Sequence, residues 1–140
     1  MENNKIHSLK FTIPCKSEAV LNTIQKIILE VEKRNPNNPD LSFRMEVAER
    51  EMLANAFKHG CCENEKGEIK IELVFYSDRV KLRVKDSGEG FEYKNINLNS
   101  LPIFKETGRG LFMINKVADK IEFNEKGNAI SAYFIAVNNN

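Results

Sequence analysis

The chain has 140 residues, which is the length of one domain with a single core. A composition of 41% hydrophobic and 29% charged residues is typical of a soluble globular fold. The 21 Lys and Arg against 20 Asp and Glu leave a formal net charge of +1, which argues against nucleic acid as the main partner. Neither a signal peptide nor a membrane-spanning apolar run is visible, so we expect one cytoplasmic domain over residues 1–140 that binds no membrane.

Cysteine and histidine are too few for a structural metal cluster. The cysteines are Cys15, Cys61 and Cys62, and sequence neighbours such as Cys61 and Cys62 pair poorly without strain. With His7 and His59 as the only histidines, a structural zinc site lacks ligands. We therefore expect reduced thiols and no zinc.

The predicted fold opens with a strand and a helix. Leu9, Phe11 and Ile13 alternate with polar residues, as in a strand that Pro14 ends. A helix capped by Ser17 then covers residues 18–33, and its apolar residues recur at helical spacing: Val20, Ile24, Ile27, Ile28 and Val31. The proline-containing segment 35–39 must end this helix.

A second helix is predicted over residues 41–59, with Asp40 as its N-cap and Gly60 as its stop. Its apolar stripe consists of Leu41, Met45, Ala48, Met52 and Ala56. Glu51 and Asn55 lie four residues apart along one edge of the stripe, so both side chains face the same way.

Two interpretations of Glu51 and Asn55 are open. A glutamate beside a buried stripe is costly unless it has a catalytic role or a cation to pair with. Taken alone, however, the pair fits a solvated Glu51 and a satisfied core amide at Asn55 better. Lys58, three residues after Asn55, could meet a phosphate. His59 suits the carbonyl end of the helix, and we do not expect it to be catalytic.

A hairpin is predicted from two alternating apolar segments, 69–75 and 80–84, joined by a turn at 77–78. The second strand delivers Asp86, whose carboxylate could accept a hydrogen bond from an amino group. Gly88 and Gly90 follow, where the backbone can take a positive φ or approach a ligand closely. On its own, this segment fits an ordinary turn better.

The last third of the chain contains a polar segment, a glycine-rich helix start and a second hairpin. Residues 92–105 show no period and form either a functional lid or a loose loop. The segment Thr107-Gly108-Arg109-Gly110-Leu111 leads into a helix of about three turns, where free backbone N–H groups favour an anion and Arg109 adds positive charge. A helix that merely begins with glycine is equally open. Residues 120–123 and 129–137 predict the final antiparallel pair.

Together these elements predict an α+β fold, a two-layer sandwich in which a mixed, mostly antiparallel sheet is covered on one face by helices. Three signals point to one ligand. Asp86 offers a carboxylate for an amino group, the glycine segments suit a flat base and phosphates, and Asn55 offers an oxygen for a cation.

The chain resembles the ATP-binding domains of the GHKL superfamily, which includes gyrase, the Hsp90 chaperone, histidine kinases and MutL. Residues 51–60 are similar to the family's N box, 86–91 to its first glycine box and 108–112 to its second. Three boxes in the right order are a strong match. The small size and short lid look most like the anti-sigma-factor serine kinases of bacterial partner-switching systems.

The resemblance implies a role for each matched residue. Asp86 would bind the adenine amino group, Gly88 and Gly90 would shape the base pocket, Asn55 would ligate Mg²⁺, and Glu51 would be the general base. Residues 92–107 would close as a lid, and the remaining nucleotide-binding residues would be Lys58, Thr107, Gly108, Arg109, Gly110 and Leu111. The family's threonine near the last hairpin is absent, which leaves Asn128 and Ser131 as alternatives for its role.

The resemblance therefore implies an ATP- and Mg²⁺-dependent serine/threonine protein kinase. It would phosphorylate a small anti-sigma antagonist, sequester a sigma factor and form a homodimer. Two alternatives remain open: a nucleotide-dependent binding module without phosphoryl transfer, and the catalytic part of a histidine kinase. The second is weaker because only a few polar residues precede the first strand, whereas such domains act on a histidine in a helical dimerisation segment.

Overall fold

The computed structural model describes residues 5–61, 66–90 and 106–136, and at 106–109 only the backbone. The elements in chain order are β1 (Lys5–Pro14), α1 (Ser17–Arg34), α2 (Pro39–Gly60), β2 (Glu68–Tyr76), β3 (Arg79–Asp86), α3 (Glu106–Val117), β4 (Lys120–Phe123) and β5 (Ala129–Ile135). None of these helices combines the length and apolarity needed to cross a bilayer.

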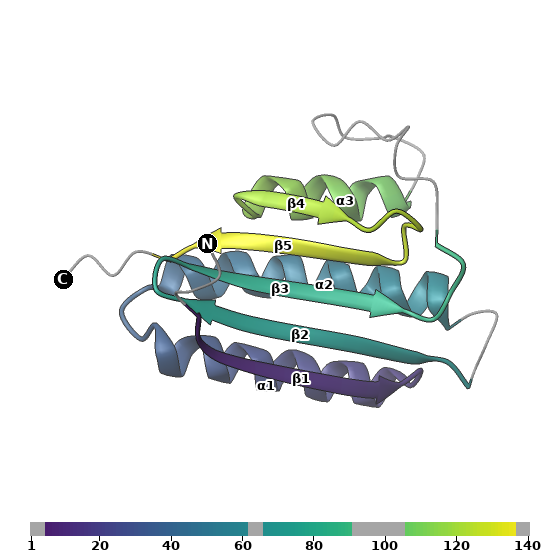
Figure 1. Ribbon diagram of the computed structural model, residues 1–140, viewed down its shortest axis with the longest axis horizontal. Helices are drawn as coiled ribbons and strands as arrows, with labels where there is room; N and C mark the ends of the chain where they lie inside the picture. The colour runs from purple at the N-terminus through teal and green to yellow at the C-terminus, as the bar shows by residue number, and fades with distance from the viewer. Residues whose placement is uncertain (1–4, 62–65, 91–105, 137–140) are drawn as a thin grey trace.

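The strands form one five-stranded sheet in the order β1-β2-β3-β5-β4, and the helices lie behind one of its faces (Figure 1). The predicted two-layer α+β architecture is confirmed. Every pairing between the described strands is antiparallel, where we predicted a mixed sheet. Because β5 lies between β3 and β4, the loop before β5 meets the end of β3, and this junction positions the candidate site.

The core is formed by the apolar residues at alternate positions of the strands and by the apolar stripe of α2. The inward residues of β2 and β3 are buried, and the predicted stripe of α2 is confirmed, with no member more than 5% exposed: Leu41, Met45, Ala48, Met52 and Ala56. Glu49 was not predicted to be buried, yet it is 0% exposed. An ionisable side chain therefore occupies a position in the core that sequence periodicity did not identify.

Neither long helix is capped by the residue predicted from the sequence. Lys16 is the N-cap residue of α1, without a side-chain cap, so the predicted Ser17 cap is wrong. In α2 the cap is Asn38 and not Asp40, because the Asn38 side chain accepts from the N–H of Leu41 at 3.1 Å. Proline in the first helical turn follows this cap directly, which is a favoured arrangement.

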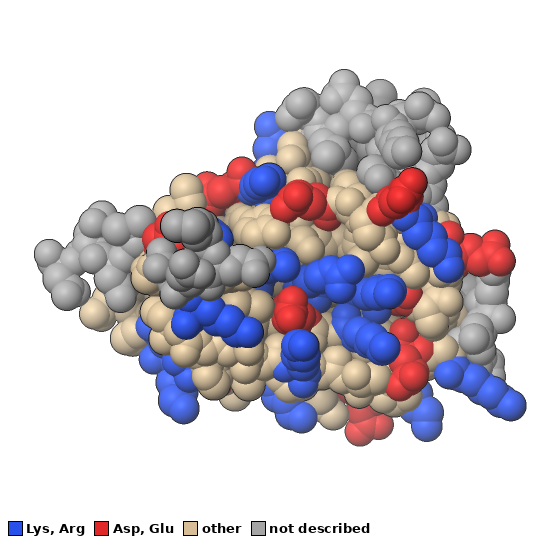
Figure 2. Space-filling model, in the orientation of Figure 1, with Lys and Arg blue, Asp and Glu red and all other residues tan. Residues whose placement is uncertain are grey.

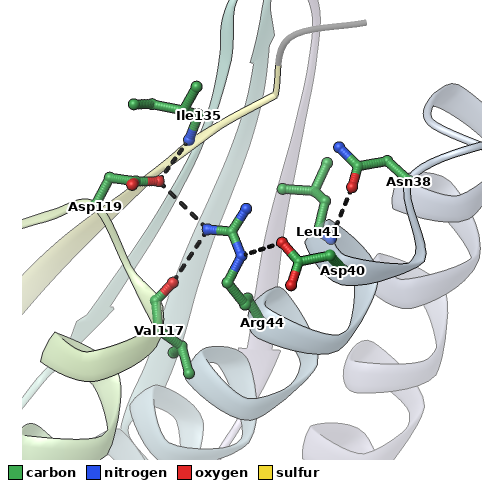
Figure 3. Close-up of polar contacts among 7 residues, drawn as sticks. All are labelled: Asn38, Asp40, Leu41, Arg44, Val117, Asp119 and Ile135. Atoms are coloured by element: carbon green, nitrogen blue, oxygen red, sulfur yellow. Dashed lines mark hydrogen bonds and ion pairs between the residues drawn. The ribbon is translucent and has the colours of Figure 1, made fainter. Parts of the chain in front are cut away.

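Arg44 joins the start of α2 to the end of α3 (Figure 3). Its Nε donates to Asp40 at 2.8 Å, and its Nη1 donates to the Val117 carbonyl at 3.2 Å and to Asp119 at 3.3 Å. Asp119 also accepts from the backbone N–H of Ile135 at 2.7 Å. These contacts hold the C-terminal end of α3 against α2 and β5.

The structure contains a disulfide between Cys15 and Cys61, so the prediction of three reduced thiols is wrong. Cys15 follows β1 and Cys61 follows α2, and these two elements end side by side. The Cα atoms of the two cysteines are 5.4 Å apart. The argument from sequence excluded only the pairing of Cys61 with Cys62, which lies outside the described residues. It could not anticipate two distant segments ending at the same place.

We expect loss of this disulfide to lower the stability of the fold. The bridge closes a loop across a sequence separation of 46 residues, and the loss of such a link costs about 2–4 kcal/mol. Cys15→Ser should therefore lower the free energy of unfolding by this amount in urea titrations under oxidising conditions. Cys62→Ser is the matched control and should have no effect, whereas equal destabilisation by both would show that Cys62 takes part in the pairing.

Candidate functional site

A narrow pocket lies where the second half of α2, the end of β3 and the loop before β5 meet. Its polar lining comes from Asn55, His59, Asp86 and Asn128, and its apolar walls include Met52, Ala56, Val84, Leu111 and Ile130. Three of the predicted segments, the α2 edge, the end of β3 and the start of α3, thus share one pocket. With a volume of about 20 Å³ it has room for little more than a water molecule, so a planar ring enters only if the walls move apart.

Asp86 is held by the backbone of its own loop and of the loop before β5. Its Oδ1 accepts from the Gly88 N–H at 2.7 Å, and its N–H donates to the Asn128 carbonyl at 2.9 Å. Burial raises the pKa of Asp86, while the Gly88 N–H and the nearby His59 and Lys126 oppose this effect. A half-buried carboxylate with fixed orientation suits recognition of a donor group inside the pocket.

The last turn of α2 packs directly on the Asp86 loop because two glycines leave room for it. A Cβ at Gly60 would collide with Asp86, and a Cβ at Gly88 would lie 2.7 Å from the His59 carbonyl. We predicted Gly60 only as a helix stop, and nothing in the local sequence indicated this contact. Glycine is required at 88 by the close approach of the α2 backbone, whereas the predicted approach to a ligand stays a prediction.

Gly90 has the positive φ predicted for this loop, at 88°. A Cβ there would also collide with the carbonyl of Lys126, in the turn before β5. Any larger residue would therefore be strained in conformation and would push the two loops apart. The glycine keeps the Asp86 loop against the β4–β5 turn.

Glu51 and Asn55 lie side by side against α3. A Cβ at Gly110 would be 2.9 Å from Glu51 Oε2 and 3.5 Å from both amide atoms of Asn55. The missing side chain of Gly110 therefore lets the two helices approach at the level of these polar groups. Because α3 begins at Glu106, Gly108 and Gly110 lie within its first residues, where we had placed them ahead of the helix.

Several predicted site residues are not brought into the pocket. Lys58 is exposed and does not line it. Thr107, Gly108 and Arg109 contribute backbone to the start of α3, and their side chains lie outside the description. The predicted lid, residues 92–107, falls outside the described residues except at its last two positions.

His59 lines the pocket, although sequence reasoning gave it no role there. Burial lowers its pKa, the charge of Lys58 lowers it further, and Asp86 acts in the opposite direction. This shift favours the neutral imidazole, which can form part of a pocket wall. This contact was not predicted from the sequence, because the free carbonyls at the C-terminal end of α2 already accounted for a histidine at this position.

Asn128, rather than Ser131, lies beside Asp86. The Asn128 side chain is 7% exposed, and its Nδ2 donates to the carbonyls of Asp86 at 3.2 Å and Gly88 at 3.4 Å. Its Oδ1 accepts from Asn124 at 2.6 Å. Ser131 pairs with Arg83 in the sheet, further from the loop. Asn128 thus fixes the backbone of the Asp86 loop.

Comparison with known proteins gives the site a context. The sequence matches the histidine kinase-like ATPase domain family over residues 14–134. Similar curated proteins include the serine-protein kinase RsbW of Halalkalibacterium halodurans, 26% identical over 140 aligned positions that cover 94% of this chain and 85% of that one. RsbW of Oceanobacillus iheyensis is 31% identical, but the alignment spans 59% of this chain and 57% of that protein, little more than half its length.

A solved structure supports the same fold. The catalytic domain of the histidine kinase ThkA superposes with a TM-score of 0.56, covering 94% of this chain and 99% of that one. Its sequence is 18% identical, so the likeness concerns the fold alone.

Proposed function

Because the chain belongs to the histidine kinase-like ATPase domain family, we propose that it is an ATP-dependent serine/threonine protein kinase of a partner-switching system. The observation that carries the proposal is the placement of Glu51 and Asn55 side by side against Gly110, next to the Asp86 pocket. The names of the RsbW relatives support the choice of a serine kinase over the other activities of the family.

Asp86 would bind the amino group of adenine, with Gly88 and Gly90 shaping the loop around the base. The apolar walls of the pocket suit a planar ring. Burial of Asp86 strengthens its hydrogen bond to a donor, since little water competes there. Nucleotide entry requires the pocket to widen from its present volume.

The triphosphate would lie along the start of α3, held by backbone N–H groups at the positive end of the helix dipole. The side chains and backbone assigned to it are Thr107, Gly108, Arg109, Gly110 and Leu111, with Lys58 near the outer end.

Asn55 fits a magnesium ion that is shared with a nucleotide. Within 5–61, 66–90 and 106–136, no three His, Cys, Asp or Glu side chains form a metal cluster. Mg²⁺ commonly uses few protein oxygens and completes its coordination with phosphates and water, so a single amide oxygen at Asn55 is a suitable donor. When bound, the ion would neutralise charge on the phosphates.

Glu51 would take the proton from the hydroxyl of an acceptor serine or threonine. The hydroxyl oxygen then bonds to the γ-phosphorus as the bond to the β-phosphate oxygen breaks, and ADP leaves. The proximity of Glu51 and Asn55 supports this role, since both side chains approach the same point of α3 at Gly110. The protein acceptor would be a small anti-sigma antagonist, the second partner a sigma factor, and the active species a homodimer.

We expect ATP binding to depend on Asp86 and its magnesium dependence to depend on Asn55. Asp86→Asn should weaken ATP binding about tenfold to a hundredfold, which corresponds to a hydrogen bond to a charged group. Asn55→Ala should retain weak binding that no longer responds to Mg²⁺. Titration calorimetry with and without Mg²⁺ measures both.

Asp78→Asn is the matched control, because this aspartate lies in the β2–β3 turn and is not part of the pocket lining. Its ATP affinity should equal that of the wild type. If the wild type binds no ATP under any condition, the proposed function is wrong and the three sequence boxes are structural remnants.

A further inference from the structure

The sheet face that carries no helices is rich in cations. Outward positions alternate with buried ones along each strand, and the register aligns them across the sheet. Figure 2 shows Lys and Arg side chains gathered over the middle of this uncovered face. We define the basic sheet face by six of its cations: Lys10, Lys70, Lys81, Arg83, Lys85 and Lys120.

Only part of this charge is compensated within the described residues. Glu72 lies 3.8 Å from Lys10 and 3.9 Å from Lys81, so one carboxylate serves two lysines. Lys120 pairs with Glu122 at 3.8 Å. Lys70, Arg83 and Lys85 have no ion pair in the part of the chain that the structure describes.

The register places two like charges opposite each other near one end of the β2–β3 ladder, where Lys70 pairs with Lys85. Two residues along, Arg83 lies opposite Glu72, the carboxylate that also lies near Lys10 and Lys81. Like charges directly opposite each other in a sheet are destabilising. An anionic group bound between them would relieve this repulsion.

A shallow groove of about 190 Å³ crosses β1, β2 and β3 next to this pair, lined among others by Lys10, Thr12, Lys70, Glu72 and Arg83. It is separate from the nucleotide pocket, because Val84 and Asp86 of β3 point to the other side of the sheet. A ligand there would not compete with ATP for space.

We propose that the basic sheet face docks an acidic surface of a second protein, with carboxylates bound between Lys70, Arg83 and Lys85. The whole chain is nearly neutral at +1, so the cations on this face are balanced by acidic residues elsewhere, and the positive potential is local. Such segregation favours a partner of complementary charge.

Other occupants fit the face less well. A second copy would bring the same cations against each other, so self-association through this face is unfavourable. A nucleic acid gains its affinity from a continuous series of cation–phosphate contacts, whereas Glu68, Glu72 and Glu122 interrupt the cations here. Discrete carboxylates on a protein can avoid these acidic positions.

The test is fluorescence anisotropy with a labelled peptide of alternating Glu and Ala, compared with a Gln and Ala peptide of equal length. The wild type should bind the acidic peptide and not the neutral one, more weakly as salt rises. The double variant Lys70→Glu/Lys85→Glu should lose at least tenfold in affinity for it, and its ATP affinity, measured separately, should stay unchanged.

The double variant Lys26→Glu/Lys33→Glu is the matched control, since it makes the same charge change on the exposed surface of α1. It should bind the acidic peptide like the wild type, and thermal melting verifies that both double variants are folded. No binding by the wild type, or equal losses in both variants, would overturn the docking proposal while leaving the ATP site intact. Tighter binding of a single-stranded oligonucleotide or of phosphatidylglycerol vesicles through Lys70 and Lys85 would overturn it in favour of those partners.

Discussion

Glu51→Gln is expected to lower the rate of phosphoryl transfer at least a hundredfold and to leave ATP affinity within about twofold of the wild type. The amide keeps the size of the side chain at Gly110, where Glu51 Oε2 lies 2.9 Å from the position of a missing Cβ, but it cannot accept the hydroxyl proton. Single-turnover transfer of labelled γ-phosphate to a purified antagonist protein measures the first quantity, and calorimetry measures the second.

Glu46→Gln is the control for this change. Glu46 lies on the same helix and pairs with Arg50 at 3.1 Å on the exposed surface, so its replacement should alter neither rate nor affinity. Undiminished transfer by Glu51→Gln would show that another group is the base. Normal ATP binding by the wild type without transfer to any acceptor would instead favour the nucleotide-dependent binding module.

Glu49→Met is expected to stabilise the fold by about 3 kcal/mol at pH 7. Glu49 is 0% exposed, and neither carboxylate oxygen has a hydrogen-bond partner among the described residues. Burial raises its pKa from 4.5 to about 9; Arg50 opposes this shift and Glu46 adds to it. Methionine has a similar shape and carries no group that must be kept protonated.

The raised pKa of Glu49 makes the stability of the wild type fall as the pH rises. Below pH 4.5 Glu49 is protonated in both the folded and the unfolded chain, and ionisation costs nothing. From there to about pH 9 the unfolded chain releases the proton and the folded chain keeps it, so stability falls by about 1.4 kcal/mol per pH unit. Above pH 9 the loss is complete.

Urea unfolding of the wild type and Glu49→Met at pH 5, 7 and 9 measures this difference. The gap between the two should be small at pH 5 and should widen at each step. Glu32→Gln on the exposed surface of α1 provides the control and should follow the wild type across the range. Parallel stability curves for wild type and Glu49→Met would show that Glu49 is not buried as a neutral acid.

Local patterns in the sequence were sufficient for the type and order of the helices and strands, and they singled out Asn55 and Asp86, which line the same pocket. Alternation identified β2 and β3, and helical spacing identified the stripe of α2, since each depends only on which face of one element is buried. The spacing of Glu51 and Asn55 and the order of the glycine segments indicated a nucleotide site. Their roles in binding and transfer stay predictions.

Contacts between distant segments were decided only by the tertiary structure. The pairing of Cys15 with Cys61, the packing of Gly60 on Asp86 and the hydrogen bonds from Asn128 to the Asp86 loop all join segments that are remote in the chain. The same holds for Glu49, whose burial depends on what packs around α2. Sequence periodicity shows which face of a single helix or strand is buried, whereas these contacts depend on where several elements end and how they pack together. The sequence by itself therefore determined the helices and strands, and only the tertiary packing determined how they form the site.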